Sequence, residues 1–116
     1  MKTPGDGVLL RVFIGESDRH GTRLLYEQIV EEARRRGLAG ATVLRGIMGY
    51  GAASRVHTAK LLRLSEDLPI IIELVDTREK IDDFIPYLDE VVQEGLVTME
   101  RAHVIRYRHT GPDDDA

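Results

Sequence analysis

The chain has 116 residues, of which 42% are hydrophobic and 31% are charged, and its formal net charge is −4. This length suits one domain with its own core, and the composition is that of a globular protein rather than a disordered chain. The absence of cysteine excludes disulfides and thiolate metal sites. No apolar run approaches the roughly 18 residues that would predict a membrane span.

The negative charge is concentrated at the C-terminus, where Asp113, Asp114 and Asp115 form a run that we expect to be solvated. The rest of the chain is nearly neutral and has no basic stripe with interleaved aromatics, so we do not expect nucleic acid as a partner. Residues 1–7 contain no apolar segment, which predicts no secretory signal of the usual form and a cytoplasmic protein. We therefore expect an N-terminal tail (1–7), one domain (8–108) and an acidic C-terminal tail (109–116).

The first predicted elements are a strand and a helix. Residues 8–14 are apolar and β-branched and stop at Gly15, which is typical of a strand buried on both faces. Residues 15–21 are polar and predict a loop, with Thr22 as the N-cap of the following helix. The helix ends near Gly37, where arginines 34–36 complement its dipole, and we assign these arginines no ligand. Its apolar stripe consists of Leu25, Tyr26, Ile29, Val30 and Ala33.

Residues 41–48 predict the second strand, and residues 61–64 with 68–75 predict a third that is broken at 65–67. The loop between them, residues 51–60, is longer than a hairpin turn, and such loops are usually functional or mobile. Asp76 is the predicted cap of a second helix, in which Pro86 should kink or split the chain. The helix ends at Glu94 and Gly95, and residues 96–107 predict the last strand. The apolar stripe of this helix consists of Ile81, Phe84, Ile85, Leu88, Val91 and Val92.

The predicted order of elements is therefore strand, helix, strand, strand, helix, strand. This order is typical of an α+β, ferredoxin-like βαββαβ sandwich, with an antiparallel sheet and two helices on one face. Residues 8–14 and 70–72 nevertheless place apolar side chains on both faces, so something must bury the bare face. Other copies of the chain are the simplest candidate, and a closed homo-oligomer has clefts between subunits in which small ligands can bind.

The most unusual chemistry lies in residues 37–51, which contain five of the chain's 11 glycines. Glycine lets the backbone come close to a neighbour or to a ligand such as a phosphate or a nucleobase. Taken singly, Gly37 could merely cap a helix, and Gly49 to Gly51 could merely turn a hairpin around Tyr50. The number of glycines together favours a binding site.

Several segments of the sequence resemble the P-II-like, domain-of-unknown-function 190 family, which is related to P-II nitrogen-regulatory proteins. The resemblance covers residues 8–107 and is specific because the segments occur in one order. They are Ile14-Gly15-Glu16-Ser17-Asp18, Leu38-Ala39-Gly40-Ala41-Thr42-Val43, Arg45-Gly46, His57-Thr58-Ala59 and Leu64-Ser65-Glu66-Asp67-Leu68-Pro69. The segment from Gly37 to Gly51 and the segment Val104-Ile105-Arg106-Tyr107-Arg108 also resemble P-II proteins themselves.

This resemblance implies a homotrimer that binds an adenine nucleotide in each intersubunit cleft and acts on a partner, such as an enzyme or membrane transporter, through the mobile loop after Gly51. It implies a signalling protein and not an enzyme. Its implied nucleotide-binding residues lie beside the adenine and at the phosphates. Gly40 and Thr42 are beside the adenine, Gly49 and Gly51 bring backbone amides to the phosphates at the loop root next to Tyr50, and Gly95, Arg106 and Arg108 are also at the phosphates. Its implied partner loop contains Ser54, Arg55, His57 and Thr58. No metal is implied.

The sequence also departs from the P-II pattern. The loop after Gly51 is shorter and has no tyrosine, so regulation by nucleotidylation of a loop tyrosine is not expected. The second phosphate loop is reduced to Glu94 and Gly95, which favours AMP or ADP over ATP. Thr42 could equally be an ordinary strand threonine, and Arg106 and Arg108 could be solvent-facing arginines at a strand end.

Three other functions compete with this interpretation. A ligand-free trimeric scaffold would differ only in lacking the nucleotide. An enzyme could use Ser54 and His57 with Asp67 or Glu66, although the loop offers no strained nucleophile elbow. A metal site would have to use histidines at positions 20, 57, 103 and 109, whose spacing fits no helix-face pair.

Overall fold

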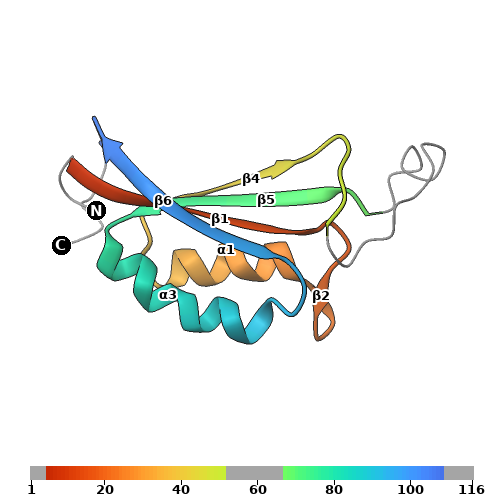
Figure 1. Cartoon of the computed structure of the whole chain (residues 1–116). Helices are drawn as coiled ribbons and strands as arrows, with labels where there is room; N and C mark the ends of the chain where they lie inside the picture. The colour runs from red at the N-terminus through yellow and green to blue at the C-terminus, as the bar shows by residue number, and fades with distance from the viewer. Residues whose placement is uncertain (1–4, 52–66, 109–116) are drawn as a thin grey trace.

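The computed structural model describes residues 5–51 and 67–108, which form one sheet with two helices packed on it (Figure 1). The elements are β1 (Gly5–Gly15), a short hairpin of β2 (Arg19–His20) and β3 (Arg23–Leu24), α1 (Leu25–Arg35), β4 (Ala41–Arg45), β5 (Pro69–Asp76), α3 (Arg78–Val91) and β6 (Leu96–Val104). The four long strands are antiparallel in the order β4-β5-β1-β6, and both helices lie on the same side of them. This confirms the predicted ferredoxin-like α+β fold.

The core lies between the helices and one face of the sheet. Alternate residues of β1 and β5 point into it, as the two-residue period of a strand requires. Complete burial of one aliphatic side chain contributes about 1.5–3 kcal/mol, so this face holds the helices on the sheet. The buried residues include Val8, Leu10, Val12 and Ile14 from β1, Ile70, Ile72 and Leu74 from β5, Leu25, Ile29 and Ala33 from α1, and Ile81, Phe84, Leu88 and Val91 from α3. The predicted helix stripes are thereby confirmed.

Helix α1 ends as predicted but begins differently. At its end, Gly37 has a φ of 80°, its N–H donates to the Arg34 carbonyl at 3.0 Å, and the next N–H donates to the Ala33 carbonyl, which together form a Schellman cap. The predicted Thr22 cap is wrong, because Thr22 lies in the turn of the β2–β3 hairpin and no side chain caps α1. The carbonyl of Asp18 instead accepts the N–H of Leu25 at 2.8 Å, so the folded hairpin replaces the cap.

Helix α3 is capped by Thr77. The sequence-based prediction of Asp76 as the cap is therefore wrong. The Thr77 hydroxyl accepts the N–H of Lys80 at 3.3 Å. Asp76 is fully buried, and its carboxylate accepts the N–H groups of Ala39 at 2.8 Å and Thr77 at 2.7 Å. The helix continues through Pro86, so the predicted split is wrong: core contacts on both sides of the proline hold the helix together despite the lost donor.

The edge strands are shorter than the sequence predicts, whereas β1 begins earlier, at Gly5. Strand β4 ends at Arg45 because the chain turns there, and Gly46 donates its N–H to the Pro69 carbonyl at 2.7 Å. Strand β6 ends at Val104, opposite Gly5, where the described part of its partner strand begins. Residues 61–64, the first half of the predicted third strand, lie outside the described residues.

The face of the sheet opposite the helices carries two rows of side chains that cross all four strands. One row is apolar and consists of the cross-strand partners Leu44, Ile71, Phe13 and Leu96. The next row is polar and consists of Thr42, Glu73, Arg11 and Thr98. Arg11 donates to the carboxylates of Glu73 and Glu100, each at 2.9 Å, and these contacts raise its pKa. The predicted apolar residues on both sheet faces are therefore confirmed.

Candidate functional site

The residues implied in nucleotide binding fall at two opposite ends of the sheet. Gly49, Tyr50 and Gly51 follow β4 at the end where β5 begins, and Gly95 precedes β6 at the same end. At the other end, Gly40 precedes β4, and Arg106 and Arg108 follow β6. Thr42 lies within β4, opposite Glu73 in the polar row. One chain therefore does not bring the whole set together. Ser54, Arg55, His57 and Thr58 of the predicted partner loop lie outside the described residues.

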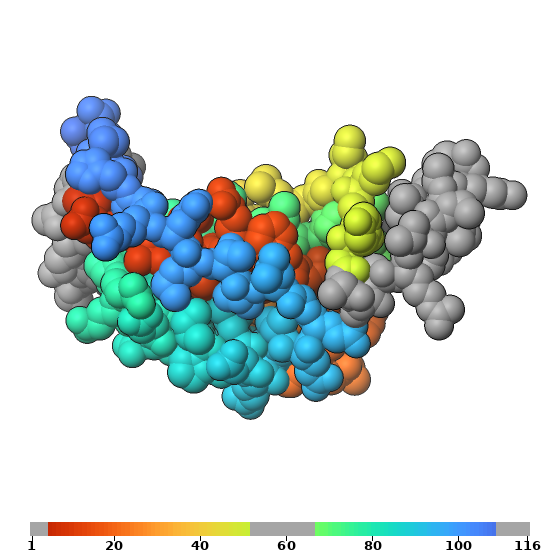
Figure 2. All heavy atoms as spheres, viewed as in Figure 1, coloured from red at the N-terminus to blue at the C-terminus, as the bar shows by residue number. Residues whose placement is uncertain are grey.

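The loop root, residues 46–51, is built against Pro69. A Cβ atom at Gly46 would lie 2.7 Å from the Pro69 Cγ atom, and one at Gly49 would lie 3.1 Å from it, so packing explains both glycines. At Gly51 an added Cβ would meet none of the described residues within 4 Å. Tyr50 is 76% exposed and Ile47 is 95% exposed. Figure 2 shows this segment, in yellow, standing out from the body of the molecule.

Three of the segments that carry the family resemblance meet beneath this loop root. Ser17 donates its backbone N–H and its hydroxyl to Asp67 Oδ1, at 3.1 and 2.9 Å. Glu16 donates its N–H to the Leu68 carbonyl at 2.8 Å, and its carboxylate pairs with Arg45 at 2.9 Å. A Cβ atom at Gly15 would lie 2.5 Å from Asp67 Oδ1, which explains that glycine. Together these contacts join the segment after β1 to the residues just before β5 and to the last residue of β4.

We call the contacts of Glu16 and Ser17 with Arg45, Asp67 and Leu68 the clamp. The sequence did not predict these contacts, although the family resemblance includes all five residues. Their spacing indicated no chemistry because the contacts join segments about 50 residues apart. The same contacts bear on the catalytic alternative: Asp67 Oδ1 is engaged twice by Ser17, so its role as an orienter of His57 would have to compete with the clamp.

At the opposite end of the sheet, Ala39 and Gly40 lead into β4. Ala39 is held by both of its backbone polar groups: the N–H donates to Asp76, and the carbonyl accepts the Tyr107 hydroxyl at 2.9 Å. Gly40 has no positive φ, and an added Cβ would meet nothing within 4 Å. Glycine at this position is therefore not required by the described fold of one chain.

Arg106 and Arg108 give this end of the sheet a positive charge. Both are exposed, and among residues 5–51 and 67–108 neither guanidinium has an ion-pair or hydrogen-bond partner. Six other arginines of the described chain are paired with a carboxylate, namely Arg11, Arg23, Arg35, Arg36, Arg45 and Arg78, whereas Arg34 and Arg101 have no such partner among the described residues. Guanidinium groups without a partner can pair with an anion such as a phosphate.

Gly95, the other predicted phosphate-loop residue, has a steric explanation. Its φ is 155°, and an added Cβ would lie 2.6 Å from the carbonyl oxygen of Phe13 and 3.1 Å from Ile14. The start of β6 packs directly on the end of β1, and only glycine fits there. The fold thus accounts for this glycine whether or not a phosphate binds nearby.

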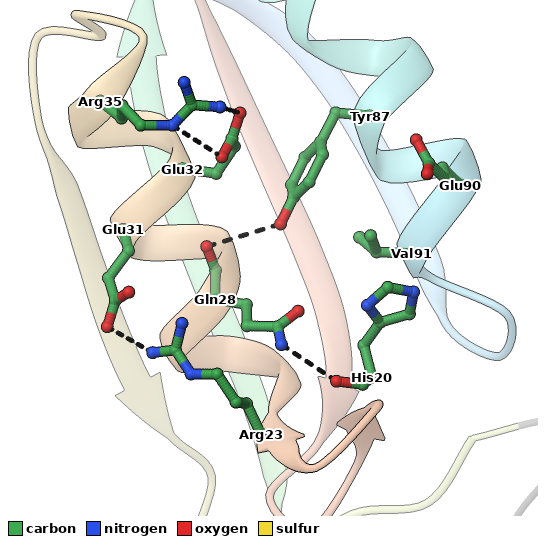
Figure 3. Close-up of a pocket in the computed structure, with 9 residues that line it drawn as sticks. All are labelled: His20, Arg23, Gln28, Glu31, Glu32, Arg35, Tyr87, Glu90 and Val91. Atoms are coloured by element: carbon green, nitrogen blue, oxygen red, sulfur yellow. Dashed lines mark hydrogen bonds and ion pairs between the residues drawn. The ribbon is translucent and has the colours of Figure 1, made fainter.

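A cavity of about 390 Å³ lies on the helix side, between α1, α3 and the β2–β3 hairpin (Figure 3). Its charged groups largely neutralise one another, since Arg23 pairs with Glu31 at 2.6 Å and Arg35 pairs with Glu32. Burial raises the pKa of Tyr87, whose hydroxyl points to the Gln28 carbonyl at 3.5 Å. The cavity contains none of the predicted site residues, and we do not regard it as the candidate site.

The described ranges contain no group of three His, Cys, Asp or Glu residues arranged to hold a metal ion. Within those same ranges no helix combines the length and apolar character needed to cross a membrane.

Comparisons with known structures define the class of the fold. A protein from Thermus thermophilus described as PII-like signalling superimposes with a TM-score of 0.60 at 18% identity, over 87% of this chain and 91% of that one. CPII from Thiomonas intermedia, solved with ADP, AMP and acetate, superimposes with a TM-score of 0.57 at 18% identity, over 90% of this chain and 93% of that one. The fold is therefore P-II-like and ferredoxin-like.

Sequence comparison identifies the family. Residues 7–104 match DUF190, described as "Uncharacterized ACR". A UPF0166 protein from Aquifex aeolicus is 39% identical over 99 residues, which cover 84% of this chain and 91% of that protein. A UPF0166 protein from Methanocaldococcus jannaschii is 38% identical with the same coverage. The chain belongs to the DUF190 (UPF0166) family, as the sequence resemblance indicated.

Proposed function

We propose that this chain is a cytoplasmic P-II-like regulatory protein, and not an enzyme, that binds an adenine nucleotide between copies of itself. In this proposal the copies form a homotrimer, and the segment after Gly51 acts on a partner enzyme or transporter. The observation that carries the proposal is the division of the implied binding residues between the two ends of the sheet. Because one chain keeps these two groups apart, a site that uses both needs a second copy.

Assembly through the open face of the sheet is supported by its side chains. The apolar row of Leu44, Ile71, Phe13 and Leu96 is continuous across four strands. Leu44 and Leu96 are 45% and 56% exposed in the single chain, and a continuous exposed apolar face usually marks an interaction site. Copies of the same chain would bury this row against one another, as in other symmetric oligomers.

The oligomeric state provides the first test, by size-exclusion chromatography with light scattering. The wild type should elute as a trimer, and Ile71→Asp should give monomers because it places an unpaired charge in the apolar row. Met99→Asp is the matched control, since Met99 is 40% exposed and lies on the other face of the same sheet. A monomeric wild type, or equal behaviour of the two variants, would contradict assembly through this face.

Nucleotide binding is supported by two features that the described fold does not require. Among the described residues, none would meet a side chain at Gly40 or Gly51, and none pairs with the guanidinium groups of Arg106 and Arg108. A bare backbone leaves room for a flat base or a phosphate, and guanidinium groups pair with phosphate oxygens. The related fold of CPII was solved with ADP and AMP, which makes an adenine nucleotide the natural first ligand to test.

The short second phosphate loop favours AMP or ADP over ATP. Gly95 packs against Phe13 and leaves little freedom at the start of β6, and the sequence offers no lysine beside it. With fewer protein contacts to the phosphates, each added phosphate group should contribute less to the affinity for the nucleotide. We therefore expect ATP to bind no more tightly than ADP.

Isothermal titration with adenosine, AMP, ADP and ATP decides the proposal. Replacing both Arg106 and Arg108 by glutamine should weaken ADP binding by at least about tenfold, because a hydrogen bond to a charged group is worth about 1.5–3 kcal/mol. Arg34→Gln is the control, since Arg34 is exposed and likewise unpaired among the described residues but lies on α1. Gly51→Val should abolish binding and spare assembly. If the protein forms a trimer that binds none of these compounds, the proposed function is wrong and the ligand-free trimeric scaffold is the better interpretation.

The catalytic alternative needs its own assay, because His57 and Ser54 lie outside the described residues. Incubation of the protein with nucleotides and simple phosphoesters should show no turnover. Turnover that disappears in His57→Ala would establish an enzyme.

A further inference from the structure

The side chain of Tyr107 ties the C-terminal segment of residues 105–108 to the far edge of the sheet. Strand β6 ends at Val104, and the segment that follows has no strand partner among the described residues. Tyr107 is half-buried, and its hydroxyl donates to the Ala39 carbonyl at 2.9 Å. Because β6 and β4 are the two edges of the sheet, this bond reaches across the whole end of the sheet.

The acceptor of this bond is itself fixed. The N–H of Ala39 donates at 2.8 Å to Asp76, which is fully buried at the end of β5. On the other side, Ala39 follows the Schellman cap of α1, in which Leu38 donates to the Ala33 carbonyl at 3.0 Å. The Tyr107 hydroxyl therefore binds a rigid part of the backbone, immediately before Gly40.

Tyr107 separates the two exposed arginines. Arg106 and Arg108 flank it in the sequence, and the bond to Ala39 brings this part of the chain to the start of β4, where no described residue would meet a Cβ at Gly40. Each contact that fixes this segment restricts its conformations, and an ordered guanidinium binds an anion with a smaller loss of entropy. The tyrosine thus links the two parts of the proposed site at this end of the sheet.

We propose that Tyr107 is a positioning residue that holds Arg106 and Arg108 beside Gly40 for the phosphate groups of the bound nucleotide. This inference rests on the proposed nucleotide-binding function. It assigns Tyr107 no contact with the ligand: the residue acts through the arginines, and its hydroxyl is satisfied by the Ala39 carbonyl. Removal of the hydroxyl should therefore affect the binding of phosphates and not of the nucleoside.

The test compares wild type, Tyr107→Phe and a control by titration with adenosine, AMP and ADP. Tyr107→Phe should weaken AMP and ADP by about fivefold, the effect of one ordinary hydrogen bond, and leave adenosine unchanged. In the background that carries Arg106→Gln and Arg108→Gln, the same change should have no further effect. Tyr87→Phe is the control, because its hydroxyl also points to a backbone carbonyl, that of Gln28, but lies on the helix side.

Each outcome decides between a positioning and a structural role. Equal weakening of adenosine and ADP, a variant that fails to fold, or unchanged binding would overturn the inference and leave the nucleotide function standing. An additional loss in the double-arginine background would also overturn it, since the effect would then not pass through the arginines. A wild type that binds no nucleotide overturns the proposed function, and this inference with it.

Discussion

The replacement Gly95→Ala tests whether glycine at the start of β6 is required by the fold or by a ligand. The backbone there has a φ of 155°, in a region that side chains rarely adopt, and a Cβ would lie 2.6 Å from the Phe13 carbonyl oxygen. Residues held in such sparsely populated conformations cost about 1–3 kcal/mol each. Because the neighbouring atom belongs to the backbone of β1, it cannot rotate away, and forced overpacking costs about 1–3 kcal/mol more.

Alanine also restricts the unfolded chain, which offsets about 0.4–1 kcal/mol of this loss. The free energy of unfolding should therefore fall by about 3 kcal/mol in Gly95→Ala, the middle of the range that these terms give. Gly51→Ala is the matched control: its backbone has no positive φ, and the new Cβ meets nothing within 4 Å. It should remain within about 0.5 kcal/mol of the wild type, which is the usual range for surface changes.

The assay is urea unfolding followed by circular dichroism, with all proteins at the same protomer concentration, since assembly makes apparent stability depend on concentration. A Gly95→Ala variant as stable as the wild type would refute the steric argument. A Gly51→Ala variant as unstable as Gly95→Ala would show that the free space at Gly51 is filled in solution.

Three further substitutions test local contacts. Thr77→Ala should cost about 1 kcal/mol of stability through loss of the α3 cap, and Thr77→Ser should restore it, both measured by urea unfolding. Asp76→Ala should cost about 2–4 kcal/mol in the same assay, because two backbone N–H groups lose their acceptor; a smaller loss would mean that water replaces the carboxylate. The guanidinium groups of Arg36 and, to a smaller extent, Arg35 lower the pKa of Glu32. The ion pairs of Glu32 therefore stabilise the fold at pH values above the pKa of Glu32 in the unfolded chain, and this stabilisation disappears as the pH falls through its pKa in the folded protein. Glu32→Gln should lower the Tm at pH 7, and the gap to the wild type should close in acid; a gap independent of pH would contradict the ion pairs.

Most of the fold could be predicted from the sequence because hydrophobic periodicity marks both helices and the two central strands. The errors lie where tertiary contacts replace local signals. Thr22 has the chemistry of a cap, but the β2–β3 hairpin puts the Asp18 carbonyl in that role. Asp76 also has the chemistry of a cap, yet it is buried and binds Ala39, a residue 37 positions away. The length of an edge strand depends on where its partner strand ends. The sequence of the edge strand does not contain this information.

The candidate site was harder to predict because glycine serves two purposes in this chain. The recurrence of glycine in residues 37–51 predicted a binding site there, but the structure gives fold reasons for several of these glycines. Gly37 caps α1, and Gly46 and Gly49 make room for Pro69. Only the three-dimensional structure distinguishes these glycines from Gly40 and Gly51, where no contact with the described residues requires glycine. The sequence could not make this distinction, since each reason for a glycine depends on a neighbour distant in the chain.

The separation of the two groups of residues has a thermodynamic consequence that links ligand binding to assembly. If the end that carries Gly40, Arg106 and Arg108 and the end that carries the loop root and Gly95 come from different copies, the monomer holds only half of the site and binds the nucleotide weakly. Because coupling between two binding events is reciprocal, the nucleotide must then favour assembly by the same factor that assembly favours the nucleotide. Saturating ADP should therefore shift Ile71→Asp from monomer towards trimer, as measured by light scattering at fixed protein concentration. A monomer that binds ADP as tightly as the trimer does would place a complete site within one chain, and residues at both ends of the sheet could not then belong to it.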